Sequence, residues 1–339
     1  MNPIFIIGTE RSGTNLLRLM LDAHPEIAVP HPPHIVKLFG TLVSRYGDLA
    51  DDGRFRLLIA DVCRMVELHP YPWECRPDRE RVFREARDRT LLAVYFAIYD
   101  QYREYAGKRR WCCKSTFMID HVPEILSYFP DARFIFMVRD GRDVAVSAKS
   151  SIFNHYHVYY SALRWQREQA TGLNWLAALP PEQIMLLKYE ELIADPPGEV
   201  RRLCSFLGEP FSEGMLEYHR SREAQKSGSL SLSWENTAKP VLRANAEKFR
   251  KSLSAGEILL FEAIACRELD RLGYRLTRPL DELLALHGEM MRPKASYRLT
   301  EMLLKLKAET THLLRDRNSR LRVKKLLFLR YLHVARRGC

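Results

Sequence analysis

A turn near the start of the chain carries residue types that bind negatively charged oxygen atoms. The turn spans residues 8–15, follows an apolar run at 3–7, and precedes a segment with the Leu and Met spacing of a helix. Gly8 and Gly13 let the backbone curl so that consecutive N–H groups point inward, and the positive end of the following helix favours an anion. We therefore expect this turn to cradle a phosphate group.

The two glycines have the spacing of a nucleotide-binding P-loop, but the residues after Gly13 depart from that pattern. A P-loop kinase or ATPase has Lys and then Ser or Thr, which binds Mg²⁺, at these positions. This chain has Thr14 and Asn15 there, and it places its cation inside the turn, at Arg11. The departure favours an oxyanion group that is held without an obligatory metal.

Other side chains that bind anions or move protons follow further apolar runs, at 111–113, 133–138 and 184–187. Each run predicts a buried strand, and a short strand is also expected before Pro30. Ligands bind at the carboxyl ends of parallel strands, so we expect one edge of the sheet to gather Arg11, His31, His34, Lys114, Arg139, Ser147 and Tyr189. Arginines follow two of the strands, which predicts one ligand with two anionic groups.

The alternation of these strands with helical segments predicts an α/β fold. We expect a P-loop-like three-layer α/β/α domain over residues 1–285, with a mostly parallel central sheet. Within it, the Arg-rich segment 35–110 has a mainly helical pattern and is expected to form a lid over the site. The Ser- and Gly-rich segment 225–234 is expected to be a mobile loop.

Composition is that of an ordinary enzyme, and 339 residues are enough for one large α/β domain with a substantial core. The seven cysteines include no Cys-x2-Cys pair, so we expect reduced thiols and neither a disulfide framework nor a zinc site. The sequence runs directly into a core strand, and no apolar run approaches the roughly 20 residues of a membrane span. We therefore expect no signal peptide and a cytoplasmic location.

The positive charge is concentrated in the C-terminal segment. Residues 292–339 contain fourteen Lys and Arg but three Asp and Glu, so this segment accounts for the whole net charge of +11. We expect residues 286–339 to form a basic amphipathic helical tail that lies on an anionic membrane surface, associates with another subunit, or stays solvated. Nucleic acid is not an expected partner, because the chain contains no recognisable binding module for it.

The sequence resembles the sulfotransferases that use 3′-phosphoadenosine 5′-phosphosulfate (PAPS), and within them the tyrosylprotein and bacterial branches. The resemblance rests on two motifs: RSGT at 11–14 with MLDAHPE at 20–26, and FMVRDGRD at 136–143 with Ser147. Lys114, KYEEL at 188–192 and LGY at 272–274 support it, so the matching pieces extend in family order over residues 3–274. The segment 35–110 would then be a lid on the acceptor side.

The resemblance implies a role for each residue of this chain that matches a functional position of the family. The loop that holds the 5′-phosphosulfate would be Arg11, Ser12, Gly13, Thr14 and Asn15. Arg139 and Ser147 would grip the 3′-phosphate, Tyr189 would line the nucleotide, and Lys114 would stabilise the transferring group. The segment 227–239 resembles one that folds over the nucleotide, so it supplies three further candidates: Ser231 and Ser233 for catalysis and Lys239 for donor binding.

The chain departs from the family at the expected general base. Related enzymes often carry a glutamate after the second strand, whereas this chain has Pro32, Pro33 and His34. A neutral imidazole with a pKa near ~6.5 can accept a hydroxyl proton near neutral pH, so we expect His34 to be the base and His31 to be the second candidate. The mechanism implied is in-line displacement on PAPS by a hydroxyl or amine, without a metal.

Two rival functions fit parts of the sequence. One is a metal-dependent P-loop kinase or NTPase, which Thr14 and Asn15 disfavour. The other is a non-catalytic nucleotide-binding protein in which the missing glutamate marks lost activity. The sequence does not choose among a carbohydrate, a lipid, a small metabolite and a peptide tyrosine as the acceptor.

Overall fold

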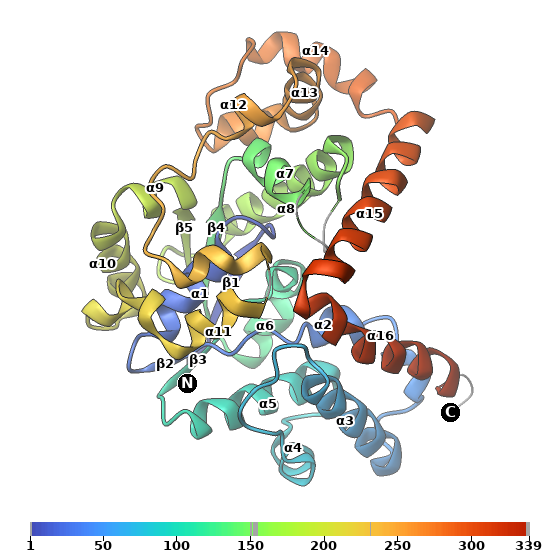
Figure 1. Cartoon of the computed structure of the whole chain (residues 1–339). Helices are drawn as coiled ribbons and strands as arrows, with labels where there is room; N and C mark the ends of the chain where they lie inside the picture. Colours follow the sequence, from blue (N-terminus) through green and yellow to red (C-terminus); the bar gives the residue numbers. More distant parts are fainter. Residues whose placement is uncertain (1, 150, 152–154, 231, 337–339) are drawn as a thin grey trace.

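A parallel sheet lies at the centre of the computed structural model, which describes residues 2–149, 151, 155–230 and 232–336 (Figure 1). Within these residues the sheet has the strand order β2-β3-β1-β4-β5, and every neighbouring pair is parallel. The strands are β1 (Ile4–Gly8), β2 (Ile27–Ala28), β3 (Arg110–Cys113), β4 (Arg133–Val138) and β5 (Ile184–Lys188). The carboxyl ends of β1, β3 and β4 therefore meet at one edge, as predicted.

Alternating side chains of β1 enter two separate apolar cores, one on each face of the sheet. Phe5 and Ile7 belong to the first core, whereas Ile4 and Ile6 belong to the second. The first core is covered mainly by α5 (Leu91–Tyr105), α8 (Val158–Ala178) and α13 (Ala255–Arg271). The second is covered by α1 (Thr14–Asp22), α9 (Tyr189–Ala194) and α10 (Pro196–Leu207). Helices on both faces confirm the expected three-layer α/β fold.

The segment 35–110 consists mainly of helices, and α3, α4 and α5 among them begin at side-chain caps. They are α2 (Ile35–Phe39), the 3₁₀ turn η1 (Val43–Tyr46), α3 (Asp52–Glu67), α4 (Arg79–Glu85) and α5. Asp51, Asp78 and Thr90 each accept a backbone N–H of the helix that follows. In α5, the ring of Phe96 stacks on Trp111 of β3 with 5.9 Å between centroids. This helix therefore belongs to a layer of the domain.

The described residues of the segment 225–234 are helical, whereas a loop was expected. The segment contains the end of α11 (Arg222–Leu230) and the start of the 3₁₀ helix η5 (Leu232–Ala238). Arg18 of α1, which is fully buried, donates from Nη1 to Glu223 at 2.8 Å and from Nη2 to Ser227 Oγ at 3.0 Å. The small side chain of Ser227 packs against the buried guanidinium of Arg18. The polar composition of this segment is therefore that of a helix held by polar contacts.

The remaining helices among the described residues follow in chain order. They are η2 (Thr116–His121), α6 (Val122–Tyr128), α7 (Gly141–Lys149), η3 (Glu213–Met215), η4 (Tyr218–Arg220), α12 (Phe249–Ser252), α14 (Leu280–Met290), α15 (Ala295–Arg315) and α16 (Arg317–Ala335). Among the described residues, none of the helices is both long and apolar enough to cross a bilayer. The cysteines within the described part are free, and most are buried.

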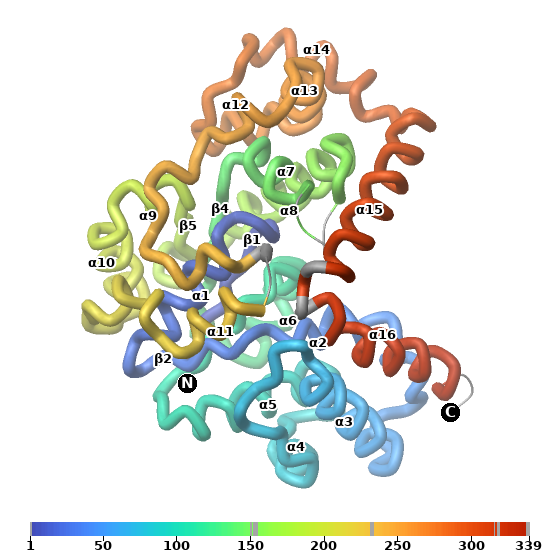
Figure 2. The backbone as a smooth tube through the Cα atoms, in the orientation of Figure 1, coloured from blue at the N-terminus to red at the C-terminus, as the bar shows by residue number. Residues whose placement is uncertain are grey.

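The tail comprises the end of α14 and the helices α15 and α16, and its described residues contact the rest of the chain. Figure 2 shows α15 running from α14 past α7 and α8, and α16 lying beside α2 and α3. Leu332 is fully buried, Arg45 Nη1 donates to the carbonyl of His333 at 2.6 Å, and Arg336 Nε donates to Asp61 at 2.9 Å. These contacts fasten α16 to the helical segment 35–110.

Candidate active site

One large cavity of about 1770 Å³ opens at the carboxyl edge of the sheet. It brings together nearly all the side chains that the sequence placed there. Its lining includes Arg11, Gly13, Thr14, Asn15, His31, His34, Lys114, Arg139, Ser147 and Tyr189. The structure therefore brings these residues together in one cavity.

The turn after β1 has the backbone conformation that the two glycines were expected to allow. Gly8 and Gly13 have φ values of 132° and 85°, and Arg11 between them has φ 74°. A Cβ atom on Gly8 would lie 2.2 Å from the carbonyl oxygen of Met137 on β4. A Cβ atom on Gly13 would lie 2.3 Å from the ring of Tyr189. Both positions thus require glycine, and the turn is packed directly against β4 and Tyr189.

The two expected anion-binding clusters are in contact with each other. Arg11 Nε donates to Ser147 Oγ at 3.1 Å, although 136 residues separate them. Arg139 Nη1 donates to the backbone carbonyl of Arg11 at 3.3 Å. The turn after β1 therefore contacts both Arg139, just before α7, and Ser147, near the end of α7.

The side chain of Arg139 is held in place by neighbours on four segments. Its guanidinium lies 4.5 Å from the ring centroid of Tyr189 and 3.6 Å from Asp143. Nη2 also donates to the carbonyl of Asn245 at 3.0 Å, and Asn245 Nδ2 in turn donates to the Tyr189 hydroxyl at 2.6 Å. Asn245 was missed by the sequence analysis, because it lies in an irregular segment without a strand or helix pattern.

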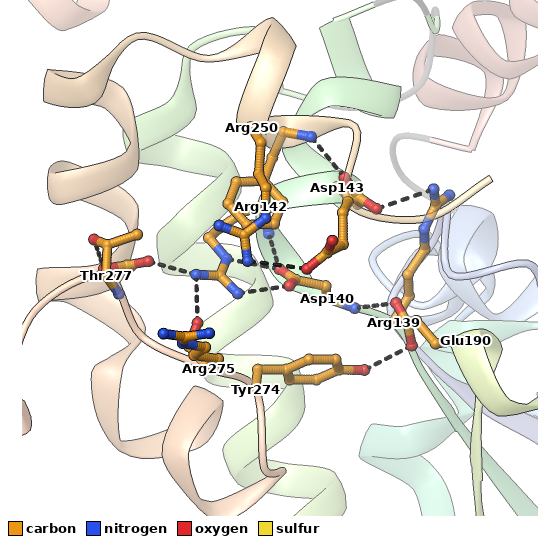
Figure 3. Close-up of polar contacts among 12 residues, drawn as sticks. Arg139, Asp140, Arg142, Asp143, Glu190, Arg250, Tyr274, Arg275 and Thr277 are labelled. Atoms are coloured by element: carbon orange, nitrogen blue, oxygen red, sulfur yellow. Dashed lines mark hydrogen bonds and ion pairs between the residues drawn. The ribbon is translucent and has the colours of Figure 1, made fainter. Parts of the chain in front are cut away.

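A buried ionic network supports the turn that carries Arg139 (Figure 3). Arg142 donates from Nε and Nη2 to Asp140 at 2.9 and 2.7 Å, and Nη1 also donates to Glu262. Glu190 accepts the backbone N–H of Asp140 and the hydroxyl of Tyr274, each at 3.0 Å. Asp140, Glu190 and Glu262 are thus engaged in ion pairs and hydrogen bonds.

Several buried polar atoms around the turn have no hydrogen-bond partner within the described part of the chain. They are Ser12 Oγ, Asn15 Nδ2 and Arg139 Nε. All three can donate a hydrogen bond. Buried donors are normally satisfied, so this set, together with the curled backbone, fits a ligand with anionic oxygens.

The two candidate bases occupy different positions in the cavity wall. His31 is 4% exposed, its ring stacks on Tyr71 with 4.8 Å between centroids, and Trp234 lies 4.9 Å from it. His34 begins α2 with φ 57°, and its ring meets Phe117 edge-on. Neither ring nitrogen of His31 has a partner among the described residues, and the same holds for Nδ1 of His34.

Burial and nearby cations set the protonation of these groups. Burial lowers the pKa of His31 and of His34 well below the ordinary value, with Lys114 among the further causes in both. Both imidazoles are therefore neutral at neutral pH and can accept a proton. Burial, followed by the charge of Arg18, also lowers the pKa of Lys114 to about 8, which leaves this amine mostly protonated at neutral pH.

The segment that was expected to fold over the nucleotide does reach the cavity, though not through every predicted residue. Trp234 and Asn236 line the cavity. Ser231 lies outside the described residues, as does the side chain of Ser233. The amine of Lys239 is exposed and donates to Asn236 Oδ1 at 3.2 Å, and Lys239 is not among the residues that line the cavity in the described part.

Other cavity residues were missed by sequence reasoning. They include Glu10, Lys37, His69, Arg164, Lys248 and Lys325. Glu10 accepts from Arg164 Nη1 at 3.1 Å, so this carboxylate is already engaged in an ion pair. His69 was detectable as the only histidine in the Pro-rich break near 70, but Lys325 comes from the tail and no local pattern links it to the site. Within the described residues, no group of three His, Cys, Asp or Glu side chains is arranged as a metal site.

Comparison with known proteins shows which protein family the chain is similar to. A family model described as a sulfotransferase family matches residues 3–213. Protein-tyrosine sulfotransferase 1 of Danio rerio is 27% identical over 285 residues, which cover 81% of this chain and 72% of that relative. Protein-tyrosine sulfotransferase 2 of Gallus gallus is 26% identical over 283 residues, which cover 81% and 70%.

Solved structures share the fold. The sulfotransferase domain from the Synechococcus PCC 7002 olefin synthase has a TM-score of 0.54 at 20% identity and covers 81% of this chain and 96% of its own. The sulfotransferase domain from the curacin biosynthetic pathway has a TM-score of 0.55 at 21% identity, with coverage of 81% and 98%.

Proposed function

This chain belongs to the sulfotransferase family, and from that membership we propose that it moves the sulfuryl group of PAPS to a hydroxyl group, or an amine, of an acceptor by in-line displacement. The family makes the chain an enzyme of sulfuryl transfer. What we propose beyond this is the identity of the donor, of the general base and of the acceptor.

The contact between Arg11 and Ser147 is the observation that carries the proposal for the donor. Its hydrogen bond of 3.1 Å joins the turn after β1 to the helix after β4. Adenosine 3′,5′-bisphosphate (PAP), the product of the donor, carries two phosphates on one ribose, at the 3′ and 5′ positions. Two adjacent cationic clusters, one with inward-facing backbone N–H groups, suit such a pair of anions.

We assign one of these two clusters to each anionic group of the donor. Residues 11–15 would hold the 5′-phosphosulfate, and Arg139 with Ser147 would hold the 3′-phosphate. Tyr189, already packed against Gly13 and under Arg139, would line the nucleotide. When bound, PAPS supplies a sulfuryl group attached to a phosphate oxygen that leaves readily.

The chain's own residues supply the proton transfer and the charge stabilisation. His34, or His31 in its place, accepts the acceptor's hydroxyl proton at a ring nitrogen, since burial keeps both imidazoles neutral. Arg11 and Lys114 line the same cavity and oppose the negative charge that grows during transfer. Removal of one such donor typically lowers the rate by about 10²–10³.

The relatives' names suggest one class of acceptor, protein tyrosine, which we include among the hydroxyl compounds to be tested. A P-loop kinase is disfavoured, because Thr14 and Asn15 replace the Lys and the Mg²⁺-binding hydroxyl of that class.

Binding of PAP and of adenosine 5′-phosphate by calorimetry tests the donor assignment. The two ligands differ only in the 3′-phosphate, so wild-type protein should prefer PAP by about 10- to 100-fold. Ser147→Ala should lose most of this preference, whereas Ser205→Ala, on the exposed side of α10, should keep it. Equal affinity of the wild-type protein for both ligands, or tighter binding of ATP with Mg²⁺, would refute the proposal.

A further inference from the structure

The C-terminal arm, defined here as residues 295–336, forms part of the wall of the active-site cavity. Arg298, Glu301, Leu304, Lys305, Arg322 and Lys325 are among the arm residues that line it. In Figure 2, α15 lies on the side of α7 and α8, and α16 lies on the side of α2 and α3. The family match ends at residue 213, well before the arm.

Specific contacts hold both halves of the arm in this position. On α15, the carboxylate of Glu301 accepts the backbone N–H groups of Tyr156 and His157 at 2.9 and 2.6 Å. On α16, Arg336 bonds Asp61, whose carboxylate also accepts the hydroxyl of Tyr46 at 2.8 Å. The arm is therefore a fixed wall of the cavity.

α16 brings a buried lysine next to the proposed base. Lys325 is 8% exposed, and its Nζ donates to the carbonyl of Pro33 at 3.3 Å. Pro33 directly precedes His34. Lys37, one turn further along α2, also lines the cavity, with its Nζ 3.8 Å from the ring centroid of Phe117. Two amines from different parts of the chain thus approach the acceptor side of the cavity.

Both positive and negative charges surround these amines. Burial and the charges of Arg322 and Lys37 lower the pKa of Lys325 to about 7, and Glu309 is the carboxylate that acts most on Arg322. The carboxylate that acts most on Lys37 is Glu10, which is already paired with Arg164. A buried amine in such surroundings is costly to keep charged without an anion.

We propose that Lys37 and Lys325, with Arg322 beside them, form an anion subsite completed by the arm, and that the acceptor carries a carboxylate, phosphate or sulfate group besides the hydroxyl that is sulfated. The inference rests on the proposed function, since it names the class of acceptor for that reaction. In this arrangement the arm selects the acceptor, while the turn at 8–15 and Arg139 bind the donor.

Calorimetry on protein saturated with PAP tests the subsite, because the nucleotide then occupies the donor clusters. Inorganic phosphate, sulfate and acetate are titrated separately in low-salt buffer, and the strongest of the three identifies the anionic group. We expect one of them to bind, and Lys37→Gln and Lys325→Gln each to weaken that binding about tenfold or more. Lys324→Gln removes the adjacent, exposed amine and should leave the affinity unchanged.

The results separate this inference from the proposed function. If PAP itself does not bind, the proposed function fails first and the subsite falls with it. If PAP binds but the saturated protein takes up none of the three anions, or if Lys324→Gln weakens binding as much as Lys325→Gln, the anion subsite is wrong and the donor assignment is unaffected. Retained PAP affinity in Lys325→Gln verifies that this variant is folded.

Discussion

At the scale of single residues, the site depends on a few side chains whose conformation and protonation are set by their surroundings. Arg11 sits in a left-handed conformation between two glycines, and its guanidinium reaches Ser147. His31 is buried, His34 is half-buried, and within the described part of the chain neither ring nitrogen of His31 nor Nδ1 of His34 has a hydrogen-bond partner. The motifs predicted these residues because each follows a strand end. They could not predict Lys325, whose proximity to the site depends on contacts between distant segments.

The assignment of the base leads to a prediction about turnover. His34→Ala should lower the turnover of labelled PAPS with a working acceptor by about 10²–10⁴, because the hydroxyl proton then has no positioned acceptor. The PAP affinity should remain, since His34 is not part of the donor clusters. His31→Ala, measured in parallel, tests whether His31 is the base instead of His34. If both variants bind PAP and turn over at nearly the wild-type rate, the histidine base is excluded.

Buried histidines also make stability depend on pH. The pKa of His31 is lowered in the folded state, so below the ordinary histidine pKa of about 6.5 the unfolded chain binds a proton that the folded chain does not. The free energy of unfolding should therefore fall as the pH decreases below about 6.5, by up to about 1.4 kcal/mol per pH unit for one such group.

His31→Phe keeps a ring against Tyr71 but removes the titrating group. Urea unfolding at several values between pH 7.5 and 5.5 should therefore show a smaller decrease for this variant than for the wild-type protein. Identical decreases in both proteins would mean that His31 does not carry a lowered pKa.

At the scale of elements, the sheet was predictable because its strands are uninterrupted apolar runs that are buried on both faces. The five strands lie where the runs lie, within a residue or so at each end. α11 was not predictable, because its buried positions include Ser227 as well as Ala224 and show no apolar stripe. What fixes this helix is a partner 205 residues away along the chain, the ion pair of Glu223 with Arg18.

Removal of that partner should therefore loosen α11. Glu223→Ala leaves the fully buried Arg18 without its carboxylate, which should cost about 2 kcal/mol in the free energy of unfolding. Hydrogen exchange should speed up over residues 222–238. The control is Glu217→Ala, which breaks an exposed pair with Arg220 and should change stability by less than about 0.5 kcal/mol. Equal effects of the two variants would contradict the anchoring role of Arg18.

At the scale of the whole molecule, the tail is the part that sequence reasoning described least well. Composition predicted basic helices, and the structure has them, but their docking over the cavity depends on scattered contacts such as Glu301 with the backbone of Tyr156 and His157. Apolar side chains remain exposed on the outer side of α15, among them Leu303, Leu306 and Leu314. Membrane contact or self-association through the tail therefore stays a prediction, which vesicle sedimentation and light scattering can test.

The most direct test of the account is a crystal structure of the protein with PAP. The account predicts one nucleotide in the cavity, with its 5′-phosphate against the backbone N–H groups of residues 11–15 and its 3′-phosphate within hydrogen-bonding distance of Arg139 and Ser147. A nucleotide that binds with only one phosphate at these clusters, or that binds elsewhere on the molecule, would contradict the account.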